Sequence, residues 1–588
     1  MKRSLLLFSV LSLILFSCSN NTKDTIKSLS GTKLIKSFED ASLSYIDADD
    51  SEGPVYVLKL QGSHYEMGYQ YGYLVGDKVN ALWWRFMEGI SDITDNERGL
   101  DVPVIPAEVL DTMFGTILED AFEHLEPYLP KEIKDEIDGI GDGAKASGLS
   151  NLHPTVKQIV KRTLALANIS DLDEWNRDLN EIIKVFATGY SYQWYNYYGI
   201  KQTVSTNYPP GYEEAFDVMK KTLPHMNCSF FSAWGDRTKD GHLLGSRNLD
   251  WSSNTGINRV KLLTVYKPDN GYSYLTIGYA GFIGALAGIS SKGLIVGEVG
   301  SNNVLERLKG EPWVIKFREI MEKASNLNEA TQFIINNVDD GFNRPNTIGY
   351  NCMVSWGDPE HNGADASGSI FELNGALAAV RHHSHDCKES VNIYKMDKSG
   401  KVTNYNNPVT GNLEGNTYEI NIKGEVRKLI KTEDSYYDDV TGSPLKVGKP
   451  LACAFYKGDE ALTYNIRRWQ SASHGPWAGD GTGLMFESGS YNGRYLPMYN
   501  MIKAYESGTA YNDEDISIDD NGGVKTPLTL VEGEKIVSRA AMNGNIISVA
   551  YDATALKIRV SFESGSGENW VAASHSKYYE LDLNDWFK

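Results

Sequence analysis

The chain has 588 residues, of which 57 are Lys or Arg and 77 are Asp or Glu, so its formal net charge at pH 7 is −20. A surface this acidic argues against binding to nucleic acid and against electrostatic binding to anionic membranes. Five cysteines in this length exclude a scaffold built from disulfides. If Cys18 and Cys228 have the roles described below, Cys352, Cys387 and Cys453 allow at most one bridge.

The first residues have the layout of an export signal. A basic start at residues 1–3 precedes a short apolar run at residues 4–14, whereas a membrane-spanning helix needs about 20 apolar residues. The run ends in Leu-Phe-Ser-Cys at 15–18, which resembles a bacterial lipoprotein box; the alternative is an ordinary cleaved signal with an incidental cysteine. We therefore expect a lipoprotein signal peptide at 1–17 and lipidation of Cys18. The mature protein would be exported to the bacterial cell envelope, on the outer membrane, and would touch the membrane through the lipid only.

The next part of the chain is predicted to be polar at first and then mainly helical. Residues 18–50 begin with a polar stretch that cannot pack a core, so they are interpreted as a flexible tether. Residues 51–227 are predicted to form a mainly helical N-terminal region, which opens with a strand at 55–61 and a Gly-rich turn and helix at 62–72. Close helix packing at small residues is the simplest interpretation of that Gly-rich segment. The spacing of apolar residues then predicts helices at 108–128, 131–146 and 175–198.

Strand-like alternation replaces the helical spacing at Cys228. Two helices are predicted further on, at 313–324 and 327–338, and the second opens at a Ser325-Asn326 cap. The mixture of strands and helices indicates an α+β protein whose sheets pack between helical layers. The predicted strands lie at 228–234, 260–266, 272–279, 294–298, 351–356, 368–373, 543–552 and 579–583.

The segments around Cys228 and Arg247 form a candidate catalytic cluster. An Asp-Arg-Thr-Lys-Asp-Gly turn at 236–241 separates them, so two antiparallel strands would bring Arg247 and Asp250 close to Cys228. A cysteine is a strong nucleophile as the thiolate, and a neighbouring guanidinium favours that form. The alternatives are a small buried hydrophobic cysteine and a structural Arg–Asp ion pair.

Three segments resemble the N-terminal-nucleophile hydrolases of the penicillin acyltransferase-like branch, which is related to choloylglycine (bile-salt) hydrolase and acid ceramidase. They are residues 62–72, 227–251 and 349–373. The resemblance implies an α+β fold, namely a four-layer αββα sandwich preceded by the helical N-terminal region, with residues 228–588 as the catalytic region.

The resemblance also implies a role for each matching residue. The chain would cut itself between Asn227 and Cys228, which makes Cys228 an N-terminal nucleophile with its own α-amine as base. Arg247 would supply positive charge beside the thiol, and Asp250 would hydrogen-bond the α-amine. Asn351 is the candidate donor to the oxyanion, and its alternative is an Asn at a strand entry.

An additional arginine near the nucleophile is expected from the same resemblance, and the sequence leaves its identity open. Arg381, Arg467 and Arg468 all compete for that place.

Two further clusters suggest other chemistry and are rejected. The His- and Cys-rich stretch at 381–387 resembles a set of zinc ligands, but neighbouring residues cannot all converge and no second ligand group has a suitable spacing. His225 and His242 lack the local signature of a papain-like Cys–His pair. We therefore predict no metal and no cofactor.

The sequence thus predicts a self-processing cysteine amidohydrolase that cleaves, or transfers the acyl group of, a small non-peptide amide. Bile-salt-like conjugates, N-acyl amino acids, acylated peptides and ceramide-like lipids all fit. The cleaved N-terminal fragment is expected to stay bound as the partner of the catalytic fragment. The alternatives are a surface-anchored binding lipoprotein without turnover and a phospholipase-B-like lipid acyl hydrolase.

Overall fold

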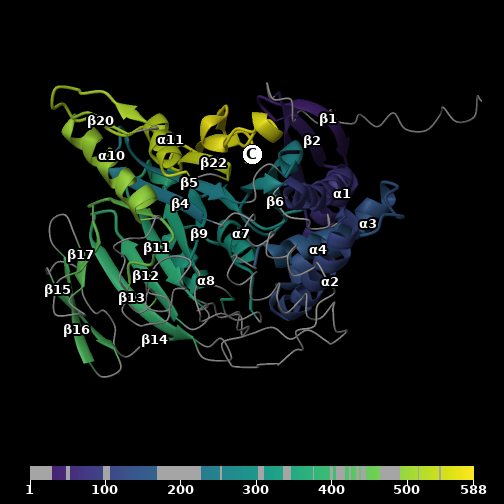
Figure 1. Cartoon of the computed structure of the whole chain (residues 1–588), viewed down its shortest axis with the longest axis horizontal. Coiled ribbons are helices and arrows are strands. Elements are labelled where there is room, and N and C mark those ends of the chain that lie inside the picture. Colours follow the sequence, from purple (N-terminus) through teal and green to yellow (C-terminus); the bar gives the residue numbers. More distant parts are fainter. Residues whose placement is uncertain are drawn as a thin grey trace, which may run out of the picture.

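The computed structural model shows how these segments are arranged in space (Figure 1). It describes residues 29–47, 53–96, 106–168, 227–251, 255–301, 310–335, 346–347, 349–374, 377–396, 402–404, 417–422, 425–431, 436–438, 445–449, 451–463, 466, 491–513, 516–541 and 544–588. The predicted signal peptide, the lipidation site Cys18 and the predicted helix at 175–198 lie outside these residues.

The larger sheet of the described chain has twelve strands in the order β1-β2-β3-β6-β7-β8-β9-β10-β11-β12-β13-β14. Only β3 and β6 are parallel among its neighbouring pairs, so a strand from before Cys228 is hydrogen-bonded to one from after it. Its strands are β1 (Lys33–Phe38), β2 (Ala41–Ile46), β3 (Val55–Gly62), β6 (Lys261–Pro268), β7 (Tyr274–Tyr279), β8 (Ala287–Ser290), β9 (Leu294–Gly300), β10 (Tyr350–Trp356), β11 (Ser367–Leu373), β12 (Leu377–His383), β13 (Glu389–Met396) and β14 (Val402–Asn404).

A second sheet of six described strands has the order β19-β4-β5-β22-β23-β24. Its strands β4 and β5 face the larger sheet: Ser232 Oγ lies 2.9 Å from Ser355 Oγ of β10, and Arg247 Nε donates to Glu298 O of β9 at 3.0 Å. The core between the sheets therefore holds the candidate cluster. The strands are β4 (Asn227–Gly235), β5 (Gly241–Asp250), β19 (Ala454–Lys457), β22 (Asn545–Asp552), β23 (Lys557–Phe562) and β24 (Tyr579–Asp582).

Two small sheets complete the strands of the described chain. One consists of β15 (Thr417–Ile422), β16 (Glu425–Lys431), β17 (Tyr436–Asp438) and β18 (Leu445–Gly448), and the other of β20 (Tyr511–Asn512) and β21 (Ser517–Ile518).

Helices cover the sheets on their outer sides (Figure 1). Helix α11 packs on β5 and β22, whereas α7 and α8 pack on strands β8 to β11. This mixture of helices and strands confirms the predicted mixed class. The main helices are α1 (His64–Asn96), α2 (Ala107–Leu125), α3 (Lys131–Ala146), α4 (Val156–Leu166), α7 (Trp313–Lys323), α8 (Leu327–Ile334), α10 (Leu496–Ser507) and α11 (Leu530–Arg539).

The predicted tether was wrong for residues 33–46. These residues form β1 and β2, and β2 pairs with β3 at the edge of the larger sheet. Ala41 and Leu43 are fully buried there. A short apolar pattern within a polar stretch is therefore sufficient to form a strand when a neighbouring strand supplies hydrogen bonds and a surface to pack against.

The Gly-rich segment is confirmed as a helix-packing motif. Gly68 and Gly72 of α1 lie against the backbone of α3, and Gly139 and Gly143 of α3 lie against the backbone of α1. A Cβ atom at any of the four would overlap a backbone carbonyl oxygen of the other helix. The two helix axes therefore approach more closely than larger side chains would permit.

Candidate active site

The predicted hairpin around Cys228 is confirmed. Strands β4 and β5 pair antiparallel, with Cys228 opposite Leu249 and Phe230 opposite Arg247. The turn after Gly235 reverses the chain as the Asp-Gly signal predicts. Cys228 and Arg247 are therefore diagonal neighbours, close enough for a long side chain to reach the thiol.

Cys228 lies fully inside the protein beside two charged groups. Its Sγ is 3.6 Å from Arg247 Nη2 and 4.0 Å from Glu298 Oε2. Burial raises the pKa of the Cys228 thiol well above its usual range, and the positive charge of Arg247 offsets only part of this effect. The thiol is therefore neutral in the uncut chain at physiological pH, and it needs a base to react.

Glu298 of β9 brings a carboxylate to within 4.0 Å of that thiol, and it was not among the predicted residues. Its Oε2 lies 3.1 Å from Arg247 Nη2, and its main-chain oxygen accepts from Arg247 Nε. Burial raises the pKa of Glu298, the Arg247 charge lowers it, and the result is about 7. A glutamate within the apolar run at 294–300 was the sequence signal that could have identified it.

The nitrogen of Cys228 also has a charged neighbour. It donates to Asp459 Oδ1 at 3.2 Å, and Asn351 Nδ2 donates to the main-chain oxygen of Asp459 at 3.0 Å. Asn351 is fully buried on β10, and Asp459 lies in the loop after β19. Asp459, which no local pattern marked, thus contacts the nitrogen that cleavage would free, and the bond from that amine to Asp250 stays a prediction.

Asp250 lies at the end of β5 and is held by two other groups. Its Oδ2 is 2.5 Å from Arg494 Nη1, and its Oδ1 accepts from Asn545 Nδ2 at 2.8 Å. Arg494, in the short helix η5 (Tyr491–Tyr495), is therefore the late arginine that the described structure brings to the cluster. Asp250 connects it to β5.

Of the three arginines considered from the sequence, the structure describes Arg381 alone. Arg381 is buried on β12, where its Nη1 lies 3.5 Å from Thr463 Oγ1. Arg467 and Arg468 lie outside the described residues.

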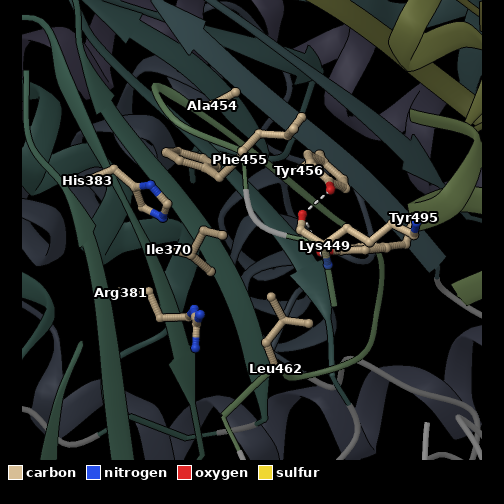
Figure 2. Close-up of a pocket in the computed structure, with 10 residues that line it drawn as sticks. Ile370, Arg381, His383, Lys449, Ala454, Phe455, Tyr456, Leu462 and Tyr495 are labelled. Carbon is tan, nitrogen blue, oxygen red and sulfur yellow. Dashed lines mark hydrogen bonds between the residues drawn. The ribbon is translucent and has the colours of Figure 1, made fainter. Parts of the chain in front are cut away.

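A pocket is lined in part by Leu462, which lies three residues after Asp459 (Figure 2). Its cavity volume is about 20 Å³, close to the space that one water molecule needs. Arg381 and His383 project from β12 on one side, and Phe455, Tyr456 and Leu462 lie across from them. Its walls are mainly apolar, and they are formed by Ile370, Arg381, His383, Lys449, Leu451, Ala454, Phe455, Tyr456, Leu462 and Tyr495.

The His- and Cys-rich stretch is part of a covalent crosslink. Cys387 forms a disulfide with Cys453, which is the one bridge that the cysteine count allows. Among the residues that the structure describes, no group of three or more His, Cys, Asp or Glu side chains is arranged to hold a metal ion. Cys352 is a free, buried thiol.

The rejected Cys–His pair has no support in the described geometry. His242 lies at the other end of β5 from Leu249, about 23 Å away at the usual rise of a strand, and its Nδ1 is 2.9 Å from Asp552 Oδ2. His225 lies outside the described residues. None of the helices in the described part of the chain has both the length and the apolar character needed to cross a membrane.

Comparison with known proteins finds distant similarity. No family model matches the chain. It is 24% identical over 354 residues to an uncharacterized protein of Archaeoglobus fulgidus, which is 60% of this chain and 49% of that protein. It is 24% identical over 303 residues to protein dcd1B of Dictyostelium discoideum, which is 50% of this chain and 47% of that protein. The chain thus spans about half the length of the curated relatives it matches.

Three of the solved structures similar to this chain are of hydrolases. The Caenorhabditis elegans ortholog of N-acylethanolamine-hydrolyzing acid amidase has a TM-score of 0.28 and 10% identity, covering 56% of this chain and 93% of that one. Two variants of the conjugated bile acid hydrolase of Clostridium perfringens have TM-scores of 0.27 and 0.25, with 13% and 15% identity, covering 61% and 60% of this chain and 97% of theirs.

Proposed function

We propose that the chain is a self-cleaving cysteine hydrolase of the N-terminal-nucleophile type that acts on small amides. The observation that carries the proposal is the environment of Cys228. Its thiol lies beside Arg247 and Glu298, and its nitrogen, which cleavage would free, is bonded to Asp459. A structural cysteine needs no charged partner for its own main-chain nitrogen.

Self-cleavage would begin from the uncut chain. Cys228 Sγ attacks the carbonyl carbon of Asn227, and its proton passes to Glu298, whose Oε2 is 4.0 Å away. The peptide C–N bond breaks, the nitrogen takes up a proton, and a thioester joins Asn227 to the thiol. Water then hydrolyses the thioester to give the Asn227 carboxylate and a free Cys228.

Turnover would use the amine that this step releases. An α-amine has a reference pKa of about 7.7 to 8.0, so it can accept the thiol proton near neutral pH. Arg247 stabilises the thiolate, while Asp459 holds the amine. Asn351 has a second side-chain N–H beyond the one donated to Asp459, and we assign it to the oxyanion. Water or another amine then clears the acyl group.

The two products would stay together as a heterodimer. Strand β3 of the first product pairs with β6 of the second along residues 56–62. Glu136 of α3 also forms a bidentate ion pair with Arg318 of α7, and both side chains are fully buried. Both the strand pairing and this buried ion pair join the two products, so cleavage of one peptide bond would not release the first product.

The remaining features of the proposal follow from the sequence. The catalytic region would be residues 228–588 in a four-layer αββα sandwich. The substrate would be a bile-salt conjugate, an N-acyl amino acid, an acylated peptide or a ceramide-like lipid, and no cofactor takes part. Export and a lipid anchor at Cys18 would place the enzyme on the bacterial cell envelope.

Intact mass measurement tests the proposal directly. The wild-type protein should separate under denaturing conditions into two fragments, and the second should begin at Cys228. The Cys228→Ala variant, which loses the nucleophile but keeps the packing, should remain a single chain. A wild-type protein that stays uncut would overturn the enzyme proposal and favour the binding lipoprotein.

A substrate panel then separates the remaining possibilities. Acyl amides and matched acyl esters, offered to the cleaved protein, should show amide hydrolysis that Cys228→Ala lacks. Hydrolysis of phospholipid esters without amide hydrolysis would instead identify the phospholipase-B-like alternative.

A further inference from the structure

Asp459 lies in a short loop whose two ends are held by one buried carboxylate. The loop runs from Lys457, the last residue of β19, to Thr463. Glu372 Oε1 is 2.9 Å from Lys457 Nζ and accepts from Leu462 N at 2.6 Å, while its Oε2 accepts from Thr463 N at 2.7 Å. The carboxylate thus bridges the two sides of the loop.

Glu372 belongs to the same part of the sheet as the oxyanion candidate. It lies on β11 directly opposite Asn351 of β10, and neither side chain is exposed. Burial alone would raise the pKa of Glu372, but the charges of Lys457 and Arg381 together with the bond from Thr463 hold it at about 2. The Glu372 carboxylate is therefore ionised at neutral pH.

The strand that leads into the loop is fixed as well. Strand β19 pairs with β4 from Ala454 to Lys457, and Trp234 N of β4 donates to Cys453 O at 3.1 Å. The disulfide to Cys387 ties the same residue to the turn after β12. Because β19 is fixed, the bonds to Glu372 determine the path of the loop that follows it.

We propose that Glu372 is a positioning residue, which sets the Asp459 carboxylate against the nitrogen of Cys228. This inference rests on the proposed role of Cys228. Glu372 touches none of the reacting atoms and acts only through the loop. Its ordering of Asp459 also orders Asn351, since Asn351 Nδ2 is bonded to the main-chain oxygen of Asp459.

Replacing Glu372 by Gln would loosen the loop without changing the volume of the side chain. Two main-chain N–H groups and an ammonium all point at the carboxylate. A glutamine offers one acceptor oxygen and turns N–H donors toward the remaining groups. At least one buried donor would lose its acceptor, so the loop would have to move.

Movement of Asp459 should change the pKa of the Cys228 thiol. Burial is the main reason for the raised pKa of this thiol, and the Asp459 charge raises it further. Displacing Asp459 should therefore lower the pH at which the thiolate forms. In the part of the chain that the structure describes, the charged groups that face the Cys228 thiol or nitrogen are Arg247 and Asp250 of β5, Glu298 of β9, Asp459 of the loop and Arg494 of η5.

The test compares Glu372→Gln, Asp459→Asn and the double variant. The first readout is the rate of self-cleavage, followed by intact mass. The second is the pH midpoint for alkylation of Cys228 by iodoacetamide, with the modified peptide identified by mass spectrometry. Alkylation is measured on the cleaved protein. When a variant no longer cleaves, it is measured on the uncut chain. In each case the reference is Asp459→Asn in the same state, cleaved or uncut.

Each single variant should slow self-cleavage about ten- to a hundredfold, as expected for the loss of a hydrogen bond to a charged group. Both should lower the alkylation midpoint by about one pH unit. The double variant should have the same alkylation midpoint as Asp459→Asn alone, because Glu372 acts on the thiol through the Asp459 carboxylate. Lys457→Met, which keeps both main-chain bonds to Glu372, should shift the midpoint less.

Glu563→Gln is the matched control, since Glu563 is also fully buried but accepts from Trp570 beyond β23. It should lower the melting temperature and leave the alkylation midpoint unchanged. A Glu372→Gln protein that melts lower but keeps the wild-type midpoint would show a structural role only and would overturn the inference. If Glu372→Gln does not fold, an alkylation midpoint of Lys457→Met equal to that of the wild type would also overturn the inference. A wild-type chain that stays uncut contradicts the proposed function instead, and the midpoints still test the positioning.

Discussion

At the scale of single residues, the buried thiol of Cys228 determines what the site requires. Burial keeps the thiol neutral, and the neighbouring Arg247 only partly compensates. In the uncut chain the nitrogen of Cys228 belongs to an amide and cannot act as a base. In the proposed self-cleavage the first proton must therefore go elsewhere, and Glu298 Oε2 lies 4.0 Å from the thiol that would release it.

The rate of self-cleavage should depend on the ionisation of Glu298. Burial raises the pKa of Glu298 to about 7, so the carboxylate is available as a base above that pH and is protonated below it. The rate should therefore rise as pH passes through 7. Glu298→Gln should slow cleavage by about 10² to 10⁴ and remove this rise, because an amide accepts no proton at these pH values.

Time courses of cleavage between about pH 5 and 9 measure this dependence. Circular dichroism of the variant should match that of the wild type, which serves as the folding control. A Glu298→Gln protein with the wild-type profile would show that another group takes the proton.

At the scale of elements, the contact between α1 and α3 depends on glycine. Gly68 and Gly72 on one helix and Gly139 and Gly143 on the other leave room for backbone to touch backbone. The Gly-rich segment thus lets α1 and α3 pack closely. Its resemblance to a family motif does not place it in the active site.

Two substitutions within α3 should distinguish the effect of the contact between α1 and α3 from the effect of helix propensity. A Cβ atom at Gly143 would collide with the main-chain oxygen of Tyr69, which cannot move without its helix, so Gly143→Ala should destabilise the protein by about 1 to 3 kcal/mol. At Gly141 a Cβ atom would meet the flexible side chain of Lys157 at 3.1 Å. Gly141→Ala should change the stability by less than about 1 kcal/mol, because the gain in helix propensity offsets a small displacement.

Urea unfolding of the two variants provides the comparison. Equal losses of unfolding free energy in both would show that the glycines matter for backbone conformation and not for the distance between the helices.

At the scale of the whole molecule, a buried ionic cluster joins the parts before and after Cys228. His64 of α1 lies 3.0 Å from Glu136 Oε2 of α3 and 2.9 Å from Glu322 Oε1 of α7, and Arg318 of α7 pairs with Glu136. In a cleaved protein this cluster would span both fragments. Its charge state therefore affects the stability of the assembly.

The stability should fall in alkaline solution because of His64. Burial would lower the pKa of His64, but its bonds to Glu136 and Glu322 raise it from 6.5 to about 9. A group whose pKa is higher in the folded state stabilises fully below its unfolded pKa and loses this effect as pH rises through its folded pKa. The protein should thus lose roughly 3 kcal/mol between about pH 6.5 and 9, from a shift of some 2.5 units.

Denaturant unfolding at a series of pH values measures the loss. His64→Gln, which cannot carry the charge, should have lower stability at pH 6 and should lack the decline that His64 causes. Parallel curves for wild type and variant across this range would contradict the assignment.

The described elements show where local sequence information is sufficient. Alternating side chains and an Asp-Gly turn predicted the β4–β5 hairpin, because strand pairing across a tight turn depends on neighbouring residues. Helix α3 begins and ends where the apolar spacing predicted, at Lys131 and Ala146. The contact between Cys228 and Arg247 follows from the same hairpin. Strands β1 and β2 were missed because their burial depends on β3, to which they add an edge.

The sequence by itself determined the nucleophile candidate, the neighbouring arginine and the hairpin that joins them. Only the tertiary structure decided which groups complete the cluster. Asp459 lies 231 residues after Cys228 in the chain, and Glu298 lies 70 residues after it. Their approach is set by the stacking of two sheets and by the loop that Glu372 holds. Packing of distant surfaces depends on many weak contacts together, so no short sequence pattern reports it.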